Sequence, residues 1–415
     1  MQQLYNIKKL INIPQYKVTE IILNTEKEIH IRLEPYKRKP FICSYCGQVH
    51  KTGYHGKEET VVRDLPVFGK KTYLYVTKRR YLCPKDNCIH IEQVSWLKKW
   101  SRVTYRYAKE VNRLTAITTN QEAGWFLGLD DETVYRIDKE MLEEEYEKKL
   151  QPPPPAIHIS IDEVSYRKYH HYLTNVVDVD KKLVIWNEKG RKAEVLDRYY
   201  VGIGEKACEQ IKSVALDGAR TYISSTNRYA VNATIVYDKF HLFQKLNWAV
   251  DMTRKLELNK ARKGGNKELI NLINCKQRFI LLKNKSKLTE NQAKYLKKLC
   301  EINRPIYEAM LLKESFLKIY DFYRPEDAKS YLEKWIRETL SSEVEMFKII
   351  AESFRDKMQY IINWFKVKIS SAISEGINNK IKRLKRMAYG YKDIEYFRLK
   401  IHQHCGLLNP RLYPQ

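Results

Sequence analysis

The chain has 415 residues, which at roughly 100–200 residues per domain suggests several domains with sizeable hydrophobic cores. Its 76 Lys and Arg against 50 Asp and Glu give a formal net charge of +26, which indicates a polyanionic partner and favours nucleic acid over a membrane surface. No signal-peptide pattern and no apolar run of about 18–20 residues is present. We therefore expect a cytoplasmic protein without a membrane partner.

Two short-spaced cysteine pairs lie in residues 1–100, where alternating stretches such as Tyr73–Thr77 predict small strands. Two such knuckles can supply four thiolates to one tetrahedral zinc ion and can hold together strands that are too short to form a core. The predicted zinc ligands are Cys43, Cys46, Cys83 and Cys88. Two alternatives stay open: replacement of one ligand by His50, His55 or His90, and four unrelated thiols.

Residues 101–150 change to helical periodicity, and Asn120–Ile137 has the pattern of a helix-turn-helix. Gly124 would let two helices approach, Gly128 would make the turn, and Val134 would pack the second helix. Asp130 or Asp131 would cap that second helix. This leaves as candidate DNA contacts Thr133, Tyr135 and Arg136. Because the acidic start of the second helix would repel phosphates, a plain helical hairpin is the alternative.

Four prolines, Pro152–Pro155, cannot continue a helix and mark the clearest domain boundary. Beyond them the pattern predicts three strands, over Ile157–Ile161, Tyr172–Val179 and Leu183–Asn187. A helical stretch of about Ala193–Ile211 follows, and then two further strands, over Val214–Leu216 and Ala233–Tyr237. A meander followed by alternating helix and strand indicates a mixed α/β fold. From about residue 239 to residue 389 the pattern is helical almost throughout, with breaks at Gly264-Gly265 and Pro325.

Two aspartates each follow a short apolar strand, and a glutamate lies far downstream in a basic helix. Asp162 and Asp217 could meet where neighbouring strands leave the sheet, although either alone is common as a turn or cap residue. Glu375 shares a helix face with Asn378 or Asn379 and with basic residues; the phosphate-binding candidates of this helix are Lys382, Lys385 and Arg386. A solvated basic helix is the alternative. An acidic trio can hold two divalent cations for in-line attack on a phosphodiester, which points to an enzyme that cuts and rejoins DNA.

Several of these stretches are similar to one protein family. They are the two cysteine knuckles, Ser160–Glu163, Ala215–Gly218, Asp238–Leu242 and Glu375–Tyr391. On these residues the chain resembles the DDE-type transposases of bacterial insertion sequences, specifically the insertion-sequence L-three family. The resemblance implies a multidomain α/β plus α protein. Its ribonuclease H-like mixed-sheet catalytic core would be interrupted by a helical insertion and preceded by zinc-binding and helix-turn-helix modules.

The resemblance also implies roles for particular residues. Asp162, Asp217 and Glu375 would be the catalytic residues and would bind Mg²⁺ (or Mn²⁺), while the cysteine knuckles would bind a structural Zn²⁺. Asp238 and His241 form an Asp-x-x-His motif just after a core strand, and we favour bracing of the site over metal binding for this pair. The chain departs from the family after the second aspartate, where Gly218-Ala219 replaces a bulkier pair.

The implied protein is a transposase that binds the terminal inverted repeats of its insertion sequence and catalyses metal-dependent cleavage and strand transfer of double-stranded DNA. It would act as a homodimer or larger assembly on DNA, in the bacterial cytoplasm and associated with the nucleoid when bound. A catalytically inactive DNA-binding regulator and a structure-specific DNA nuclease are the alternatives. The expected domains begin with a zinc-binding domain over 1–100 and a helix-turn-helix domain over 101–150. The first part of the catalytic core would cover 156–245 and the helical insertion 246–364. The second part of the core, with the basic helix, would cover 365–415.

Overall fold

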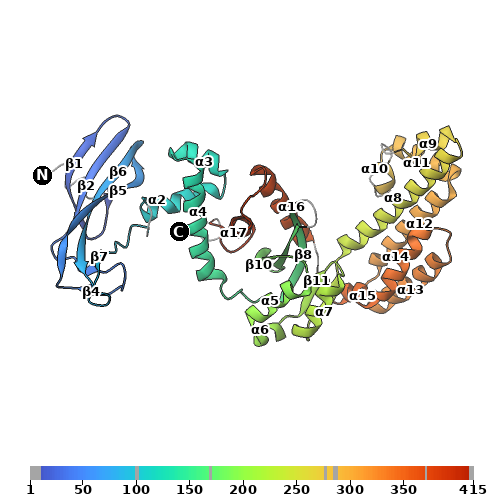
Figure 1. Ribbon diagram of the computed structural model, residues 1–415. Helices are drawn as coiled ribbons and strands as arrows, with labels where there is room; N and C mark the ends of the chain where they lie inside the picture. Colours follow the sequence, from blue (N-terminus) through green and yellow to red (C-terminus); the bar gives the residue numbers. More distant parts are fainter. Residues whose placement is uncertain are drawn as a thin grey trace. The chain divides into compact units, whose positions relative to one another are not determined.

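The computed structural model describes residues 11–98, 102–167, 171–274, 278–283, 288–369 and 372–410. The chain divides into two compact units, one within Met1–Glu145 and the other within Tyr146–Leu412. Figure 1 labels the helices and strands of both. Within the described ranges, no helix combines the length and the apolarity that a membrane crossing requires.

A five-stranded sheet opens the first unit. Its strands follow the order β1-β2-β6-β5, and β7 pairs with β6. The parallel pair is β2 with β6, and the other pairs are antiparallel. The predicted strand Tyr73–Thr77 is confirmed within β6. The bounds are β1 (Tyr16–Asn24), β2 (Glu28–Pro35), β5 (Tyr54–Val67), β6 (Lys70–Leu82) and β7 (Ile89–Ile91), with a separate hairpin of β3 (Phe41–Ile42) and β4 (Val49–His50).

Three helices complete this unit: α2 (Tyr105–Thr115), α3 (Asn120–Leu127) and α4 (Asp131–Leu150). A Cβ atom at Gly124 would lie 2.6 Å from the carbonyl oxygen of Leu129, so the turn passes too close to α3 for any other residue. Gly128 ends α3 with a φ of +65°, and Asp130 caps α4 by accepting the backbone N–H of Thr133 at 2.8 Å. The predicted functions of Gly124 and Gly128 as spacer and turn, and of Asp130 as cap, are confirmed.

The second unit is built on a five-stranded mixed sheet with the order β10-β9-β8-β11-β12. The first three strands form an antiparallel meander, whereas β8, β11 and β12 are parallel neighbours. The five strands predicted from the sequence are all present, as β8 (His158–Arg167), β9 (His171–Asp178), β10 (Leu183–Lys189), β11 (Ser213–Leu216) and β12 (Thr234–Tyr237). The helical stretch predicted over about Ala193–Ile211 is confirmed and consists of two helices. Gly204 adopts a φ of +83° and separates α5 (Ala193–Ile203) from α6 (Glu205–Glu209).

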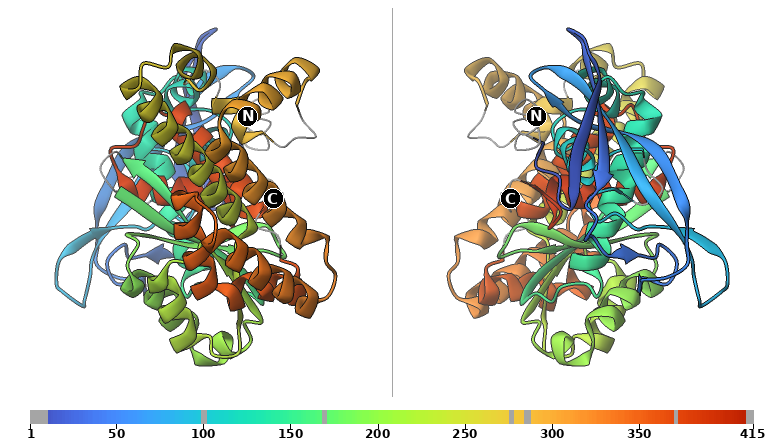
Figure 2. Two further views of the ribbon diagram at one scale, coloured as in Figure 1. Left: turned by 90° about the vertical axis from the view of Figure 1, so that its right-hand side faces the viewer. Right: turned by 90° about the vertical axis from the view of Figure 1, so that its left-hand side faces the viewer.

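Helices cover both faces of this sheet (Figures 1 and 2). α5 and α7 (Arg220–Tyr229) share a core with Ile159 and Ile161. On the other face, α16 (Ala372–Met387) and α17 (Ile394–Cys405) share a core with Val164. Because side chains alternate along a strand, Ser160 and Asp162 of β8 face α16, on the same side as Val164.

A helical region lies between β12 and α16 and has a core of its own. Gly264 ends its first helix and Pro325 begins another, as the predicted breaks require. Asn363 donates to the backbone oxygen of Ile235 at 2.8 Å and so connects the region to the outer strand of the sheet. The bounds are α8 (Lys239–Lys263), α9 (Lys267–Leu272), α10 (Arg278–Leu282), α11 (Glu290–Ile302), α12 (Arg304–Leu317), η3 (Lys318–Asp321), α13 (Pro325–Leu340), α14 (Glu345–Asp356) and α15 (Met358–Val367).

Candidate functional site

Asp162 lies on the central strand of the mixed sheet. Its Oδ1 accepts the backbone N–H of Glu163 at 2.7 Å, and its Oδ2 accepts Nδ2 of Asn378 from α16 at 2.5 Å. Two residues earlier on the same face of β8, the hydroxyls of Ser160 and Ser374 are hydrogen-bonded at 2.7 Å. These two contacts fix α16 against β8 and hold the Asp162 carboxylate in one orientation.

Asp217 follows β11, the parallel neighbour of β8. Its Oδ1 accepts the backbone N–H of Ala219 at 2.9 Å. Gly218 has a φ of +76°, and a Cβ atom there would lie 2.6 Å from the ring of Tyr237. The Tyr237 ring on the neighbouring strand β12 therefore leaves room only for glycine at position 218, where the chain departs from the family pattern.

We expect Gly218→Ala to destabilise the protein by about 1–3 kcal/mol, because the new methyl group overlaps a fully buried ring and the φ is strained for alanine. The measurement is the midpoint of thermal unfolding. Gly376→Ala is the matched control, since its Cβ would meet no atom within 4 Å and alanine favours the helix. Equal midpoints for the two variants would contradict the contact with Tyr237.

Asp238 and His241 lie together at the start of α8. Asp238 caps this helix by accepting the backbone N–H of Phe240 at 2.7 Å. Nε2 of His241 lies 3.7 Å from Oδ2 of Asp238 and 3.8 Å from Oδ1 of Asp162. The imidazole thus stands between carboxylates that come from two different strands, which favours bracing as the role of this pair.

The electrostatics of this site suit a cation. Burial raises the pKa of Asp162 above its usual range, and the negative charges of Asp238 and Asp217 raise it further, while His241 and the N–H of Glu163 lower it. Burial also raises the pKa of Glu163. Carboxylate oxygens that repel one another in a partly buried place are the donor set that Mg²⁺ and Mn²⁺ prefer, so the residues present fit these ions.

Glu375 lies in the first turn of α16, between the two residues that contact β8. The carboxylate oxygens of Asp162, Asp217 and Glu375 are not within 4.8 Å of one another in the described structure. The structure instead brings Asp162 together with Asp238, His241 and Asn378. Helical spacing placed Asn378 or Asn379 on the same face as Glu375, but the sequence analysis predicted no contact of either amide with Asp162.

The metal-type cluster of the first unit consists of Cys43, Cys46, His50 and Cys83, whose sulfur and nitrogen atoms lie within 4.8 Å of one another. Cys88, which the sequence predicted as the fourth zinc ligand, is not in this cluster, and His50 stands there in its place. His50 contacts Sγ of Cys46 through Nε2 at 3.1 Å, and this hydrogen bond lowers the pKa of Cys46 to about 6.

Cys88 is exposed and lies outside the cluster. The backbone explains this, because the N–H of Cys83 binds the carbonyl of Cys88 at 2.8 Å and the N–H of Cys88 binds Asp86 at 3.1 Å. The second knuckle is thereby closed as a turn that leaves the Cys88 thiol in solvent. The sequence offered His50 as one of three possible replacements and gave no means to select it.

The predicted DNA contacts differ in their accessibility. Arg136 on α4 is exposed, whereas Thr133 and Tyr135 are half-buried. On α16, Lys382 and Arg386 are exposed, and the ammonium group of Lys385 donates to the carbonyl of Ser165 at 3.1 Å.

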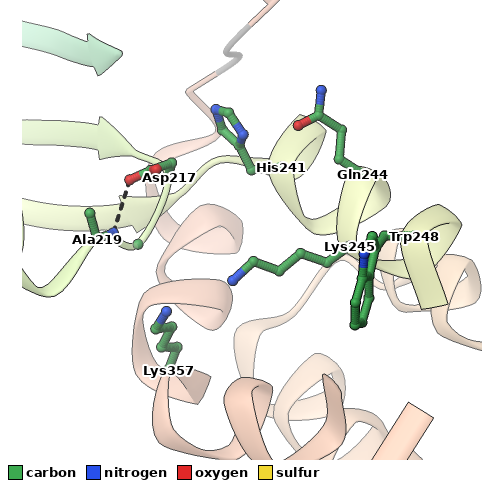
Figure 3. Close-up of a pocket in the computed structure, with 8 residues that line it drawn as sticks. Asp217, Ala219, His241, Gln244, Lys245, Trp248 and Lys357 are labelled. Atoms are coloured by element: carbon green, nitrogen blue, oxygen red, sulfur yellow. Dashed lines mark hydrogen bonds between the residues drawn. The ribbon is translucent and has the colours of Figure 1, made fainter. Parts of the chain in front are cut away.

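A cavity of about 360 Å³ opens beside Asp217 and His241 (Figure 3). Lys245 and Trp248 reach it from α8, and Lys357 reaches it from the junction of α14 and α15. The sequence analysis missed both lysines because nothing distinguishes them in a chain with 76 basic residues. The cavity is lined by Asp217, Gly218, Ala219, His241, Gln244, Lys245, Trp248 and Lys357.

Comparisons with known proteins match both units. A family model described as a transposase, of the insertion-sequence L-three (ISL3) type, matches residues 159–401, and a model described as the zinc-finger of transposase IS204/IS1001/IS1096/IS1165 matches residues 39–88. The transposase for insertion sequence element IS1001 of Bordetella parapertussis is 30% identical over 381 residues, which cover 90% of this chain and 91% of that protein. The transposase for IS1557 of Mycobacterium tuberculosis is 24% identical over 370 residues, which cover 84% and 82%.

Proposed function

The chain belongs to the insertion-sequence L-three family of transposases, and from this we propose that it binds the terminal inverted repeats of its insertion sequence and catalyses metal-dependent DNA cleavage and strand transfer. The observation that carries the proposal is the setting of Asp162. Its carboxylate lies on the central strand, held by Asn378 and facing His241, with Asp217 at the end of the next strand.

The catalytic core is proposed to be ribonuclease H-like. Three features support this: the three-strand meander that continues into parallel strands, the helices on both faces, and the helical region between Asp217 and Glu375. In this core, Asp162, Asp217 and Glu375 are the proposed metal ligands and catalytic residues. His241 lies beside the carboxylate of Asp162 on the side of α8, next to Asp238, and Asn378 donates a hydrogen bond to it from the side of α16.

Mg²⁺ or Mn²⁺ held by the three acids would supply activation of the attacking hydroxyl and stabilisation of the leaving oxygen. The chain's own residues orient the ligands, because the carboxylates of Asp162 and Asp217 belong to parallel neighbouring strands and accept the N–H groups of Glu163 and Ala219. No protein side chain needs to become covalently attached to DNA. Structural Zn²⁺ would be held by the cysteine and histidine cluster of the first unit.

DNA binding is proposed to rest on α3 and α4 as a helix-turn-helix, and on the exposed Lys382 and Arg386 of α16. The net charge of +26 supports this assignment, because neutralised phosphates release counterions and favour association. Cleavage and pairing of two DNA ends would require a homodimer or larger assembly.

We expect Arg136→Ala to weaken binding to the inverted-repeat end by about 5- to 100-fold, the range for loss of one phosphate or base contact. Arg113→Ala is the control, because Arg113 is exposed and basic but lies on α2 and pairs with Glu110 at 3.3 Å. Affinity is measured by fluorescence anisotropy at one fixed salt concentration. Equal affinities for Arg136→Ala and wild type would remove Arg136 from the interface.

The proposal is tested with a labelled DNA end taken from the inverted repeat that flanks the gene, incubated with full-length protein, Mg²⁺ and a target plasmid. A transposase cuts the labelled strand at the end of the repeat and joins it to the plasmid. Cutting without any joined product would favour the nuclease, and binding without cutting would favour the inactive regulator.

A further inference from the structure

We propose that the cavity beside Asp217 is a nucleotide subsite, in which Lys245 and Lys357 bind one backbone phosphate next to the cleaved bond and Trp248 stacks on the attached base. This inference rests on the proposed function and names the part of the DNA that this cavity receives. Figure 3 shows the side chains of Asp217, His241, Lys245, Trp248 and Lys357 around the same space.

The two lysines form a cationic pair that Asp217 attracts without forming a salt bridge. Their ammonium nitrogens lie 5.3 Å and 5.5 Å from the ring centre of the same tyrosine, Tyr237. In the described structure, no carboxylate oxygen lies within 4.0 Å of either ammonium. Burial lowers the pKa of both lysines and repulsion from Lys357 lowers that of Lys245 further, while attraction to Asp217 raises the pKa of both. A bound phosphate would relieve this repulsion with two charge-assisted contacts.

The face of α8 that lines the cavity is unusual for a packed helix. His241, Gln244, Lys245 and Trp248 follow one another at steps of three, one and three residues, so they share one face. The next face carries Leu242, Leu246 and Ala249, which are buried in the helical core. The cavity-lining stripe is thus polar and aromatic, and it faces Asp217, Gly218 and Ala219, which follow β11, together with Lys357.

Trp248 supplies the flat surface that a base requires. Its side chain is 47% exposed and lines the cavity one turn of helix after Gln244, whose amide can hydrogen-bond a base edge. Indole rings stack on bases of any sequence. At about 360 Å³ the cavity falls within the range of small-ligand sites, so its size suits a single nucleotide, and stacking on Trp248 needs a base that is not stacked within a duplex. The subsite would therefore take a nucleotide that has left the base pair at the DNA end.

The experiment uses full-length protein that carries Asp162→Ala, so that DNA binds without being cut. The probe is an inverted-repeat duplex with 5-iododeoxyuridine at single positions across the end and its flank, which is irradiated and analysed by peptide mass spectrometry. We expect a crosslink on Trp248 from one or two adjacent positions beside the cut. Trp248→Phe should retain it and Trp248→Ala should lose it. Crosslinks that map only to other residues would overturn the proposal.

The lysine pair is tested by the salt dependence of binding to the same duplex. Lys245→Ala with Lys357→Ala should reduce the slope of log affinity against log salt by about 0.7–0.9, the contribution of one phosphate. Lys260→Ala, about 22 Å further along α8 by helical rise, should leave the slope unchanged. The lysine variant should unfold at the same or a higher temperature without DNA, because a like-charge contact is removed. An unchanged slope would overturn the anion site.

Failure of the nucleotide subsite and failure of the proposed function give different results. Wild-type protein that cuts and joins DNA without a Trp248 crosslink leaves the transposase intact and removes the subsite. Wild-type protein that binds no inverted-repeat end contradicts the proposed function, and the subsite with it.

Discussion

Asp162→Ala is expected to reduce DNA cleavage by about a thousandfold or more while end binding stays within about threefold of wild type. The carboxylate accepts a hydrogen bond from Asn378 and lies 3.8 Å from Nε2 of His241, which in turn lies 3.7 Å from Asp238. Loss of the Asp162 carboxylate removes a proposed metal ligand, whereas the proposed DNA contacts lie on other elements. Cleavage is measured on the labelled inverted-repeat end, and binding is measured by anisotropy.

Asp180→Ala is the matched control for this variant. Asp180 is an exposed aspartate between β9 and β10, so its removal changes the charge of the same unit without touching the site. It should cut DNA at the wild-type rate. If Asp162→Ala cuts DNA at a comparable rate, Asp162 is not a catalytic residue and the geometry around it has another purpose.

His50→Ala and Cys43→Ser should each release the zinc of the first unit, whereas Cys88→Ser should keep it. Structural zinc sites in finger peptides contribute about 10–16 kcal/mol of binding energy that is also folding energy, so loss of a ligand should unfold the region around β3 and β4. The zinc content is measured by metal analysis after purification, and unfolding is followed by limited proteolysis. The two variants that lose zinc, His50→Ala and Cys43→Ser, should be cleaved by protease between residues 39 and 88.

The zinc contents of the His50 and Cys88 variants decide between the ligand set seen in the structure and the one predicted from the sequence. The sequence favoured four thiolates, and the structure places an imidazole nitrogen in the cluster with an exposed Cys88 thiol. Retention of zinc by His50→Ala together with its loss from Cys88→Ser would restore the four-cysteine site. Protein that contains no zinc in its wild-type form would contradict a metal role for either set.

Local patterns explain how much of the fold was predictable. The strands of the mixed sheet and the turn at Gly124, Gly128 and Asp130 follow from alternation, small residues and capping, which are properties of neighbouring residues. The helical stretch over about Ala193–Ile211 also follows from a local pattern, and Gly204 divides it into α5 and α6. The order of the strands, with β8 between β9 and β11, depends on pairing between distant segments and is not written in any local pattern.

In the candidate site, too, the features set by neighbouring residues were predictable and those set by distant residues were not. Asp162 and Asp217 were found because each follows a short apolar strand, a local signal. The contact of Asn378 with Asp162, and the meeting of Lys245 with Lys357, join residues that are distant along the chain. Their approach is decided by how α16 packs on β8 and how the helical region packs on β12. The requirement for glycine at 218 likewise comes from the ring of Tyr237 and not from its own neighbours.

The central claim is that this protein joins a DNA 3′-hydroxyl to a target strand without a covalent protein intermediate. The most direct measurement supplies a pre-cut inverted-repeat end that carries either a 3′-hydroxyl or a 3′-deoxy terminus, with target plasmid and Mg²⁺. We predict a joined product from the 3′-hydroxyl end alone, absent without Mg²⁺ and absent with Asp162→Ala. Joining of the 3′-deoxy end, or DNA covalently attached to the protein, would contradict the account.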